Sequence, residues 1–306
     1  MIIDKAGSNS SHLFILRRNL IFRKKTGEII KEFKEKGIDC LVLKGLYFAF
    51  SIYPDAGLRP MVDADLLVKK EDLDKITAIL NALGYTEQSP RKQRAYGCDA
   101  TFSSKDEACS IDIHWDLCQY ERFKGIIDIT GDFWARAVGF NLDSLPAKTL
   151  SIEDHILYVS LHYGLVHLLD NKFNGAYDLF YLIHSHIFYW EAIINSARKY
   201  GIETPLYYSL HKACKITGLR LPDFVLERLK PCFFKRKLID YLLFRRTTFV
   251  LRYLCQALMI RHFSDTFKVL WRLLKGMRRQ YNRSSSLTGV GVRCLLPFPL
   301  NQQRST

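Results

Sequence analysis

The sequence lacks two features of secreted and membrane-spanning proteins. Its N-terminus, MIIDKAGSNSSHLF, has no apolar stretch after a basic start and no small-residue cleavage site, so it does not match a secretory signal. No apolar run reaches the roughly 18 residues that a spanning helix needs, because arginines such as Arg245, Arg252 and Arg261 interrupt the C-terminal runs. We therefore expect a cytoplasmic protein that is soluble or peripheral to the membrane.

Paired cysteine motifs are also absent. The chain has 8 cysteines, but no two have the Cys-x-x-Cys spacing, and no histidine pair accompanies them in a zinc pattern. We expect reduced thiols that mostly fill small spaces in the core.

Acidic residues are scarce in one region. The net charge is +14, yet residues 1–230 are almost balanced, whereas residues 231–283 contain 13 Lys and Arg and only Asp240 and Asp265. Aromatic and aliphatic residues alternate with the basic ones across 235–283. This composition suits an anionic membrane surface, nucleic acid or an acidic partner, and it equally suits a helical cap with a solvated charged face.

The pattern of apolar residues changes along the chain. The first part mixes helical and strand patterns, with strands expected at 38–45, 62–68 and 110–117 and helices at about 12–36, 46–53 and 71–83. After Pro146 only helical patterns follow, at 151–169, 174–187, 189–200, 204–217, 222–229 and across 235–281. We predict an α/β N-terminal domain at 1–148, an all-helical C-terminal domain with the basic segment at 149–283, and a poorly ordered tail at 284–306.

Three carboxylates lie on two of the expected strands. Asp63 and Asp65 are separated by one residue, so their side chains leave the same face of a strand. Asp112 lies on the polar face of the strand at 110–117. Three carboxylates on adjacent strands can hold two Mg²⁺ or Mn²⁺ ions, an arrangement that suits nucleotidyl transfer. An Asp-x-Asp pair is also common at solvated strand ends, so the pair alone leaves both interpretations open.

Two segments resemble the bacterial nucleotidyltransferase family within the DNA polymerase beta superfamily. They are LKGLYFAFSIYPDAGLRPMVDADLLV at 43–68 and IDIHWDL at 111–117. The resemblance covers about residues 10–225, and its weaker matches are His162, Asp178, Trp190 and Pro222. It implies the polymerase-beta-like nucleotidyltransferase fold, with a small mixed sheet flanked by helices. It also implies Asp63 and Asp65 as the metal pair, with Asp112 as the third carboxylate.

The chain departs from the wider superfamily at two positions. The superfamily usually has Gly-Gly or Gly-Ser after the first strand, whereas Gly45 is followed by Leu46. Ala64 stands between the two aspartates, where isoleucine is usual. The first departure concerns the contacts to the triphosphate, and the second concerns packing.

Charged residues near the aspartates are candidates for nucleotide binding. Lys44 and Gly45 lie where a strand passes into a helix, a place where backbone N–H groups and the helix dipole attract phosphate. An ordinary strand-end lysine and turn glycine would have the same sequence. Arg59 stands in a proline-bounded turn, where its guanidinium can contact a phosphate or form an ion pair that positions the loop.

Three histidines have open roles. His114 shares a strand face with Asp112 and can bind metal, orient the base, contact substrate or be purely structural. His162 and His167 are five residues apart, so on an α-helix they do not point the same way as a metal-binding pair would. We expect His162 in the core or between the domains.

The sequence thus predicts a metal-dependent nucleotidyltransferase that uses an NTP, such as ATP, and an unidentified hydroxyl acceptor and releases pyrophosphate. One alternative is a toxin-like transferase that adds nucleotides to tRNA. Another is a non-catalytic module that binds an anionic membrane or nucleic acid through its basic C-terminal helix. The presence of all three carboxylates argues against the non-catalytic module.

Overall fold

A computed structural model gives the arrangement of most of the chain. It describes residues 8–88, 97–106, 108–118, 123, 125–172, 174–245, 248–260, 268, 271 and 272. The predicted tail at 284–306 and most of the basic segment after Ile260 lie outside the described residues, so their structure stays a prediction.

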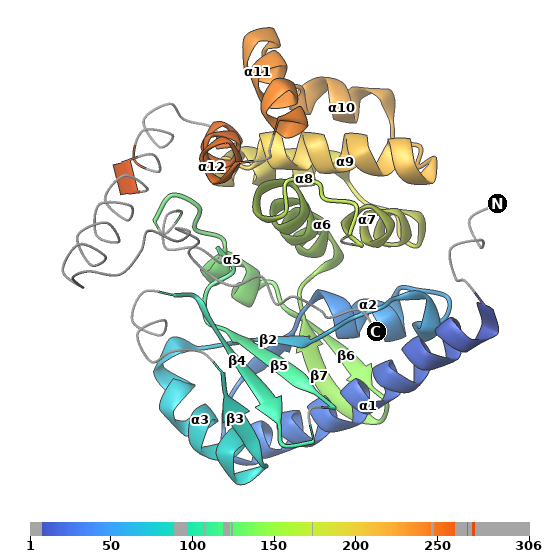
Figure 1. Cartoon of the computed structure of the whole chain (residues 1–306), viewed down its shortest axis with the longest axis vertical. Coiled ribbons are helices and arrows are strands. Elements are labelled where there is room, and N and C mark those ends of the chain that lie inside the picture. Colours follow the sequence, from blue (N-terminus) through green and yellow to red (C-terminus); the bar gives the residue numbers. More distant parts are fainter. Residues whose placement is uncertain are drawn as a thin grey trace, which may run out of the picture.

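A seven-stranded mixed sheet forms the N-terminal part of the molecule (Figure 1). The strand order is β3-β4-β5-β2-β1-β7-β6, with β2 parallel to β5 and β1 parallel to β7. The strands are β1 Cys40–Val42, β2 Ala64–Val68, β3 Tyr85–Glu87, β4 Asp99–Ser104, β5 Ser110–His114, β6 Val138–Leu142 and β7 Leu145–Thr149. The predicted mixed sheet is confirmed, and it is larger than the three strands expected from the sequence.

The hairpin of β6 and β7 crosses the predicted domain boundary. β7 contains Pro146, a residue that normally argues against a strand. It is accommodated because β7 pairs with β1 only through Thr149 and Val42, at the far end of β7 from Pro146. Thr149 Oγ1 also donates to the carbonyl of Val42 at 2.6 Å. The boundary predicted between residues 148 and 149 therefore falls inside a strand.

In the described residues, four α-helices accompany the sheet in the N-terminal part. They are α1 Ser8–Glu35, α2 Lys44–Ser51, α3 Leu73–Ala82 and α5 Thr130–Ala135. α1 is amphipathic and buries Phe22, Ile29 and Phe33, and it contacts α2, α3 and β7. α2 follows β1 directly and contacts β2, which places its first residue beside the start of β2.

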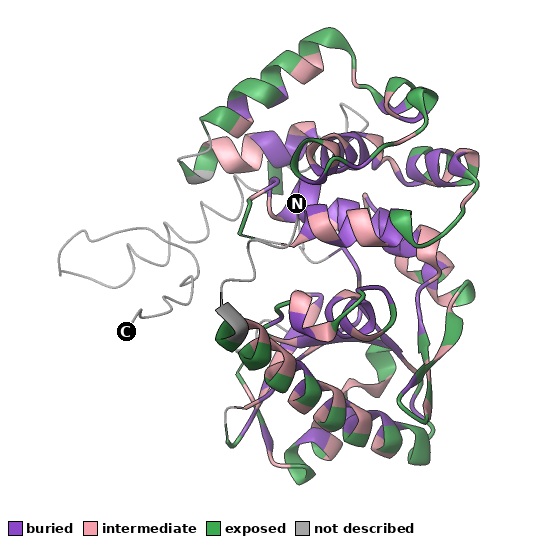
Figure 2. Cartoon of the chain, turned by 90° about the vertical axis from the view of Figure 1, so that its right-hand side faces the viewer, coloured by how far each residue is buried: buried purple, intermediate pink, exposed green. Residues whose placement is uncertain are grey.

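Every described element after β7 is a helix. They are α6 Ile152–Ser160, a π-helical turn Leu161–Val166, α7 Gly175–His184, α8 Trp190–Tyr200, α9 Glu203–Thr217, α10 Asp223–Leu229, α11 Phe233–Phe244 and α12 Phe249–Leu258. The hydrophobic core is one cluster that runs from Phe22 in α1 to Ile260 after α12 (Figure 2). The helical content of this part is confirmed, whereas its separation as a domain of its own stays a prediction.

Candidate functional site

The site is built where β2 and β5 run side by side. The two strands are parallel, with Asp65 directly opposite Asp112, so the two carboxylates stand on the same face of the sheet. Asp63 lies two residues before Asp65, immediately before β2, and His114 lies two residues after Asp112. Ligand atoms of Asp65, Asp112 and His114 lie within 4.8 Å of one another. We call Asp63, Asp65 and Asp112 the carboxylate cluster.

The charges of the carboxylate cluster are unevenly compensated. Asp65 is only 2% exposed, and its Oδ1 accepts a hydrogen bond from His114 Nε2 at 2.9 Å and lies 3.3 Å from Lys44 Nζ. Burial alone would raise the pKa of Asp65, but Lys44 and His114 hold that pKa below its ordinary value. Burial and the charge of Asp65 raise the pKa of Asp112. Burial, together with the charges of Asp65 and Asp112, raises the pKa of Asp63 to about 7.

One oxygen of the cluster has no partner in the described part of the chain. Asp112 Oδ1 is buried and accepts no hydrogen bond from a described residue. A buried carboxylate oxygen without a donor is costly, and the contacts of Lys44 and His114 both go to Asp65 rather than to Asp112 Oδ1. A cation would satisfy both the free oxygen and the excess charge. Because most of the donor atoms are carboxylate oxygens, they fit Mg²⁺ or Mn²⁺ better than Zn²⁺.

His114 is held by the same cluster. It is 2% exposed, and its Nε2 is engaged by Asp65. Burial would lower the pKa of His114, but the hydrogen bond to Asp65 raises it above its ordinary value. In this arrangement His114 fixes the orientation of the Asp65 carboxylate.

Lys44 is the first residue of α2, and its side chain is largely buried. Burial would lower the pKa of Lys44, but the carboxylates of Asp65 and Asp63 raise it above its ordinary value, so the ammonium stays charged. The N-terminus of α2 has no side-chain cap, and the first N–H groups of a helix have no partner within the helix. Around Gly45, an added Cβ would meet Met61 at 3.5 Å, an ordinary contact, so packing within the chain does not require glycine there.

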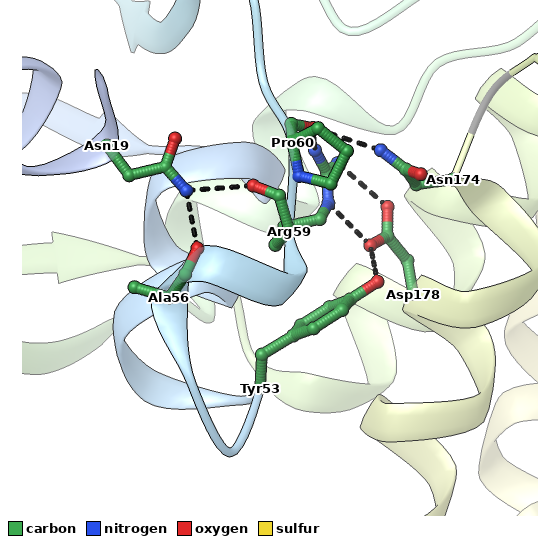
Figure 3. A network of polar contacts seen from close by, with 7 residues as sticks. All are labelled: Asn19, Tyr53, Ala56, Arg59, Pro60, Asn174 and Asp178. Carbon is green, nitrogen blue, oxygen red and sulfur yellow. Dashed lines mark hydrogen bonds and ion pairs between the residues drawn. The ribbon is translucent and has the colours of Figure 1, made fainter. Parts of the chain in front are cut away.

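Arg59 does not reach into the carboxylate cluster. Its Nε and Nη2 donate to the two carboxylate oxygens of Asp178 on α7, at 2.7 and 2.9 Å, and Nη1 donates to the carbonyl of Pro60 (Figure 3). Tyr53 donates a further hydrogen bond to Asp178 at 2.7 Å. Arg59 is 8% exposed. Of the two roles considered from the sequence, these contacts favour the ion pair that positions the loop.

The turn that carries Arg59 is fixed on both sides. Asn19 of α1 is buried and donates to the carbonyls of Ala56 and Arg59 at 2.6 and 2.8 Å (Figure 3). Asn174, next to α7, donates to the carbonyl of Pro60 at 3.0 Å. The turn leads directly to Asp63, so these contacts determine where the chain enters the site.

Comparison with known protein families shows which family the chain belongs to. The family described as "Uncharacterised nucleotidyltransferase" matches residues 9–218, more than half of the chain. The chain belongs to this nucleotidyltransferase family. The resemblance inferred from the segment at 43–68 is thereby confirmed at the level of the family. A comparison with curated proteins finds no match.

Two solved structures show weaker similarity to this nucleotidyltransferase. The lincosamide antibiotic adenylyltransferase LnuA, with lincomycin bound, has 15% identity and a TM-score of 0.38, covering 52% of this chain and 94% of that one. An antigenic nucleotidyltransferase-like protein from Paracoccidioides brasiliensis has 12% identity and a TM-score of 0.42, covering 68% of this chain and 92% of that one. At these values neither structure carries an argument about substrate or site.

The structure adds two histidines that the sequence did not place in the site. His162 Nε2 lies 3.1 Å from Lys44 Nζ and 3.3 Å from His167 Nε2. The expectation that the two histidines do not point the same way was wrong, because the segment Leu161–Val166 is a π-helical turn rather than an α-helix. In a π-helix residues five apart are hydrogen-bonded neighbours, so the two imidazoles meet.

Proposed function

We propose that this protein is a metal-dependent enzyme that transfers a nucleoside monophosphate from an NTP to a hydroxyl acceptor. The observation that carries the proposal is the carboxylate cluster, in which Asp65 contacts Lys44 and a buried oxygen of Asp112 has no partner among the described residues. Membership of a nucleotidyltransferase family supports the reaction class. ATP is among the candidate donors, and the acceptor is unidentified.

The carboxylates, Lys44 and Gly45 would have different roles in the transfer. Asp63, Asp65 and Asp112 would hold Mg²⁺ or Mn²⁺, which neutralises phosphate oxygens and lowers the pKa of the acceptor hydroxyl. Lys44 and the first N–H groups of α2 would contact the phosphates, with Gly45 allowing close approach. The acceptor oxygen bonds to the α-phosphorus, and the bond from that phosphorus to the bridging oxygen breaks. Pyrophosphate leaves, and Asp112 takes the acceptor proton.

The test is incorporation of label from each of the four α-labelled NTPs into cell extract. Wild-type protein should label a product in Mg²⁺ or Mn²⁺ and stop when EDTA is added, and Asp65→Asn should label almost nothing. Labelled tRNA as the product would establish the toxin-like alternative instead. Absence of any labelled product with all four NTPs, in the presence of either metal, would contradict the proposal.

A second proposal concerns membrane binding by the basic segment at 235–283, and it rests on the exposed residues of α11. α11 exposes five large apolar residues together with Lys237, Asp240 and the following Arg245, and Figure 2 shows this helix largely exposed. The apolar residues are Phe233, Phe234, Leu238, Tyr241 and Phe244. In the described residues no helix has both the length and the apolar character to cross a membrane.

We propose that these exposed residues of α11 bind an anionic membrane surface. Apolar side chains outnumber the cations among them, which suits insertion between lipid headgroups better than contact with nucleic-acid phosphates. Flotation with vesicles that contain phosphatidylglycerol should recover the protein, and Phe234→Ser with Phe244→Ser should abolish recovery. Phe14→Ser, on an exposed residue of α1, is the matched control. Equal recovery of all variants, or binding to RNA alone, would contradict this role.

A further inference from the structure

Lys44 is held from two sides by residues of different parts of the chain. Its Nζ lies 3.3 Å from Asp65 Oδ1 on β2 and 3.1 Å from His162 Nε2 in the π-helical turn. Lys44 therefore lies between a carboxylate of the site and an imidazole from the helical half of the molecule. The proposed reaction assigns no role to the imidazole of His162.

His162 is suited to accept a hydrogen bond from an ammonium group. Burial and the charge of Lys44 lower the pKa of His162 well below its usual range, so the ring is neutral. A neutral imidazole has one nitrogen with a free lone pair, which accepts from a donor without adding positive charge. His162 thus anchors the Lys44 ammonium without repelling it.

The turn that carries His162 has an unusual backbone. His167 N–H donates to the carbonyl of His162 at 3.0 Å, five residues back, and Leu169 N–H donates to the carbonyl of Tyr163 at 2.9 Å. Leu168 and Leu169 adopt left-handed φ values of 50° and 61°. Left-handed φ values are unfavourable for residues with a side chain. Strain of this kind persists only where the surroundings hold it, and it is common at functional sites.

Two neighbouring helices hold the turn in place. Gly164 packs against α9 so closely that an added Cβ would lie 2.8 Å from the carbonyl oxygen of Pro205 and from Ser209 Oγ. From α12, the buried Gln256 donates to the carbonyls of Leu165 and Val166, at 2.9 and 3.3 Å. Both carbonyls belong to the π-helical turn. The turn is therefore fixed by contacts that reach as far as the C-terminal helices.

We infer that His162 is a positioning residue that holds the Lys44 ammonium at the start of α2, where the phosphates of the substrate bind. The inference rests on the proposed function, because it takes the triphosphate as the ligand of Lys44. Without His162 the ammonium would keep Asp65 as its anchor and move onto a carboxylate that the metal needs. Loss of His162 should therefore weaken triphosphate binding only when Lys44 is present.

A double-mutant cycle on binding tests the inference. The dissociation constant of an ATP analogue with a non-hydrolysable α–β linkage is measured with Mg²⁺ by calorimetry for wild type, His162→Phe, Lys44→Ala and the double variant. His162→Phe should weaken binding roughly 10-fold or more, the range for a hydrogen bond to a charged group. In the Lys44→Ala background the same change should have no further effect. His162→Gln, whose amide oxygen can accept, should recover most of the affinity.

A second buried histidine provides the control. His155, on α6, is also buried, its Nε2 lies 2.9 Å from Thr149 Oγ1, and its ring stacks on Tyr47 of α2. His155→Phe should leave the affinity for the analogue unchanged. Melting curves of each variant establish that it folds, and His162→Gln keeps the test decisive if His162→Phe does not fold.

The outcomes separate this inference from the proposed function. Wild-type affinity in His162→Phe, or losses that add in the double variant, would overturn the positioning role, and additivity would indicate direct contact of His162 with the nucleotide. Nucleotide binding without transfer in the labelling assay would contradict the proposed function, while the cycle would still decide the role of His162. Failure of the wild type to bind the analogue would overturn the positioning role as well.

Discussion

Two buried clusters of charge lie close together in this protein, and they differ in balance. In the pair formed by Arg59 and Asp178, one cation meets one anion through two hydrogen bonds, and Tyr53 supplies a third. In the carboxylate cluster three acidic groups lie with Lys44 and His114, which both contact Asp65, and an oxygen of Asp112 has no partner in the described part of the chain. The first cluster pairs its charges within the chain, whereas the second could hold a further cation.

This difference in charge balance distinguishes Lys44 from Arg59, two residues for which the sequence predicted the same role. Lys44 and Arg59 were both candidates for phosphate contact, since each is a cation near the aspartates in a turn or at a helix start. Arg59 is paired with Asp178 through two hydrogen bonds and lies in the turn that leads to Asp63. Lys44 faces a cluster with excess negative charge. The contacts of each cation therefore indicate its role better than its distance from the site along the chain.

The largest effect should follow a change in the open cluster. In Asp112→Asn the side chain keeps its shape but loses its charge and the oxygen that would take the acceptor proton. Nucleotide transfer should fall by roughly 10²–10⁴, the range for loss of a positioned base. The measurement is the initial rate of label incorporation under Mg²⁺ saturation. Turnover close to wild type would place the base and the third ligand elsewhere, with His114 the next residue to test.

The closed pair should matter for stability. Arg59→Ala leaves the buried Asp178 carboxylate without its partner, which should cost about 3–5 kcal/mol in the free energy of unfolding. Replacing both residues, as Arg59→Met with Asp178→Leu, should restore part of that loss because no buried charge remains.

Urea denaturation measures these changes, and Lys148→Ala is the control. Lys148 forms an exposed pair with Asp39 at 3.4 Å, so its loss should cost less than about 1 kcal/mol. If Arg59→Ala folds with wild-type stability and binds NTP more weakly, Arg59 acts on phosphate after all.

His155 is a buried histidine without charge. Its effect on the free energy of unfolding should be smaller than that of the Arg59–Asp178 pair and should depend on pH. Burial lowers the pKa of His155 to about 3, below the value of about 6.5 in the unfolded chain. Its Nδ1 is buried with no partner among the described residues, so a second proton would have no acceptor. The unfolded state thus binds more protons below pH 6.5, and the stability present above that value is lost as the pH falls.

Removing His155 should reduce this loss. From pH 7.5 to pH 5 the contribution amounts to about 2 kcal/mol, so His155→Phe should lose about that much less stability than wild type over the same range. Urea denaturation at both pH values measures the difference. An identical change in the two proteins would show that His155 is not the group that takes up the proton.

The sequence predicted the neighbourhood of the site better than its details. The β-rich runs around Asp65 and Asp112 and the alternation of polar and apolar residues on the strand at 110–117 indicated the two strands, because side-chain alternation is a local property. The partner of Arg59 was not predictable, since Asp178 is 119 residues away and only tertiary packing brings it there.

Other elements were missed for local reasons. β3, with 3 residues, is too short for a clear periodic pattern. β7 contains Pro146, which speaks against a strand unless its pairing is known. The π-helical turn that places His162 beside Lys44, and the left-handed φ values of Leu168 and Leu169 after it, are not indicated by any propensity of their residues. Where tertiary contacts override local preference, sequence patterns did not suffice.

The proton and the metal should compete for the open cluster. The folded-state pKa of Asp63, about 7, lies above its unfolded value of about 3.9, so the metal-free protein loses stability as the pH rises through about 7. Mg²⁺ binds the deprotonated carboxylates and should raise the melting temperature more at pH 8 than at pH 5.5. Scanning calorimetry at the two pH values, with and without MgCl₂, measures this. An equal shift at both values would contradict protonation of Asp63 in the metal-free protein.

The melting temperature of wild type and Asp112→Asn at pH 8, each with and without Mg²⁺, tests most directly whether the carboxylate cluster is a cation site. If the three carboxylates repel one another without metal, the metal-free Asp112→Asn protein should be at least as stable as metal-free wild type. Mg²⁺ should raise the melting temperature of wild type, and the rise should shrink in the variant. A variant that is less stable without metal and keeps the full Mg²⁺ shift would contradict the account.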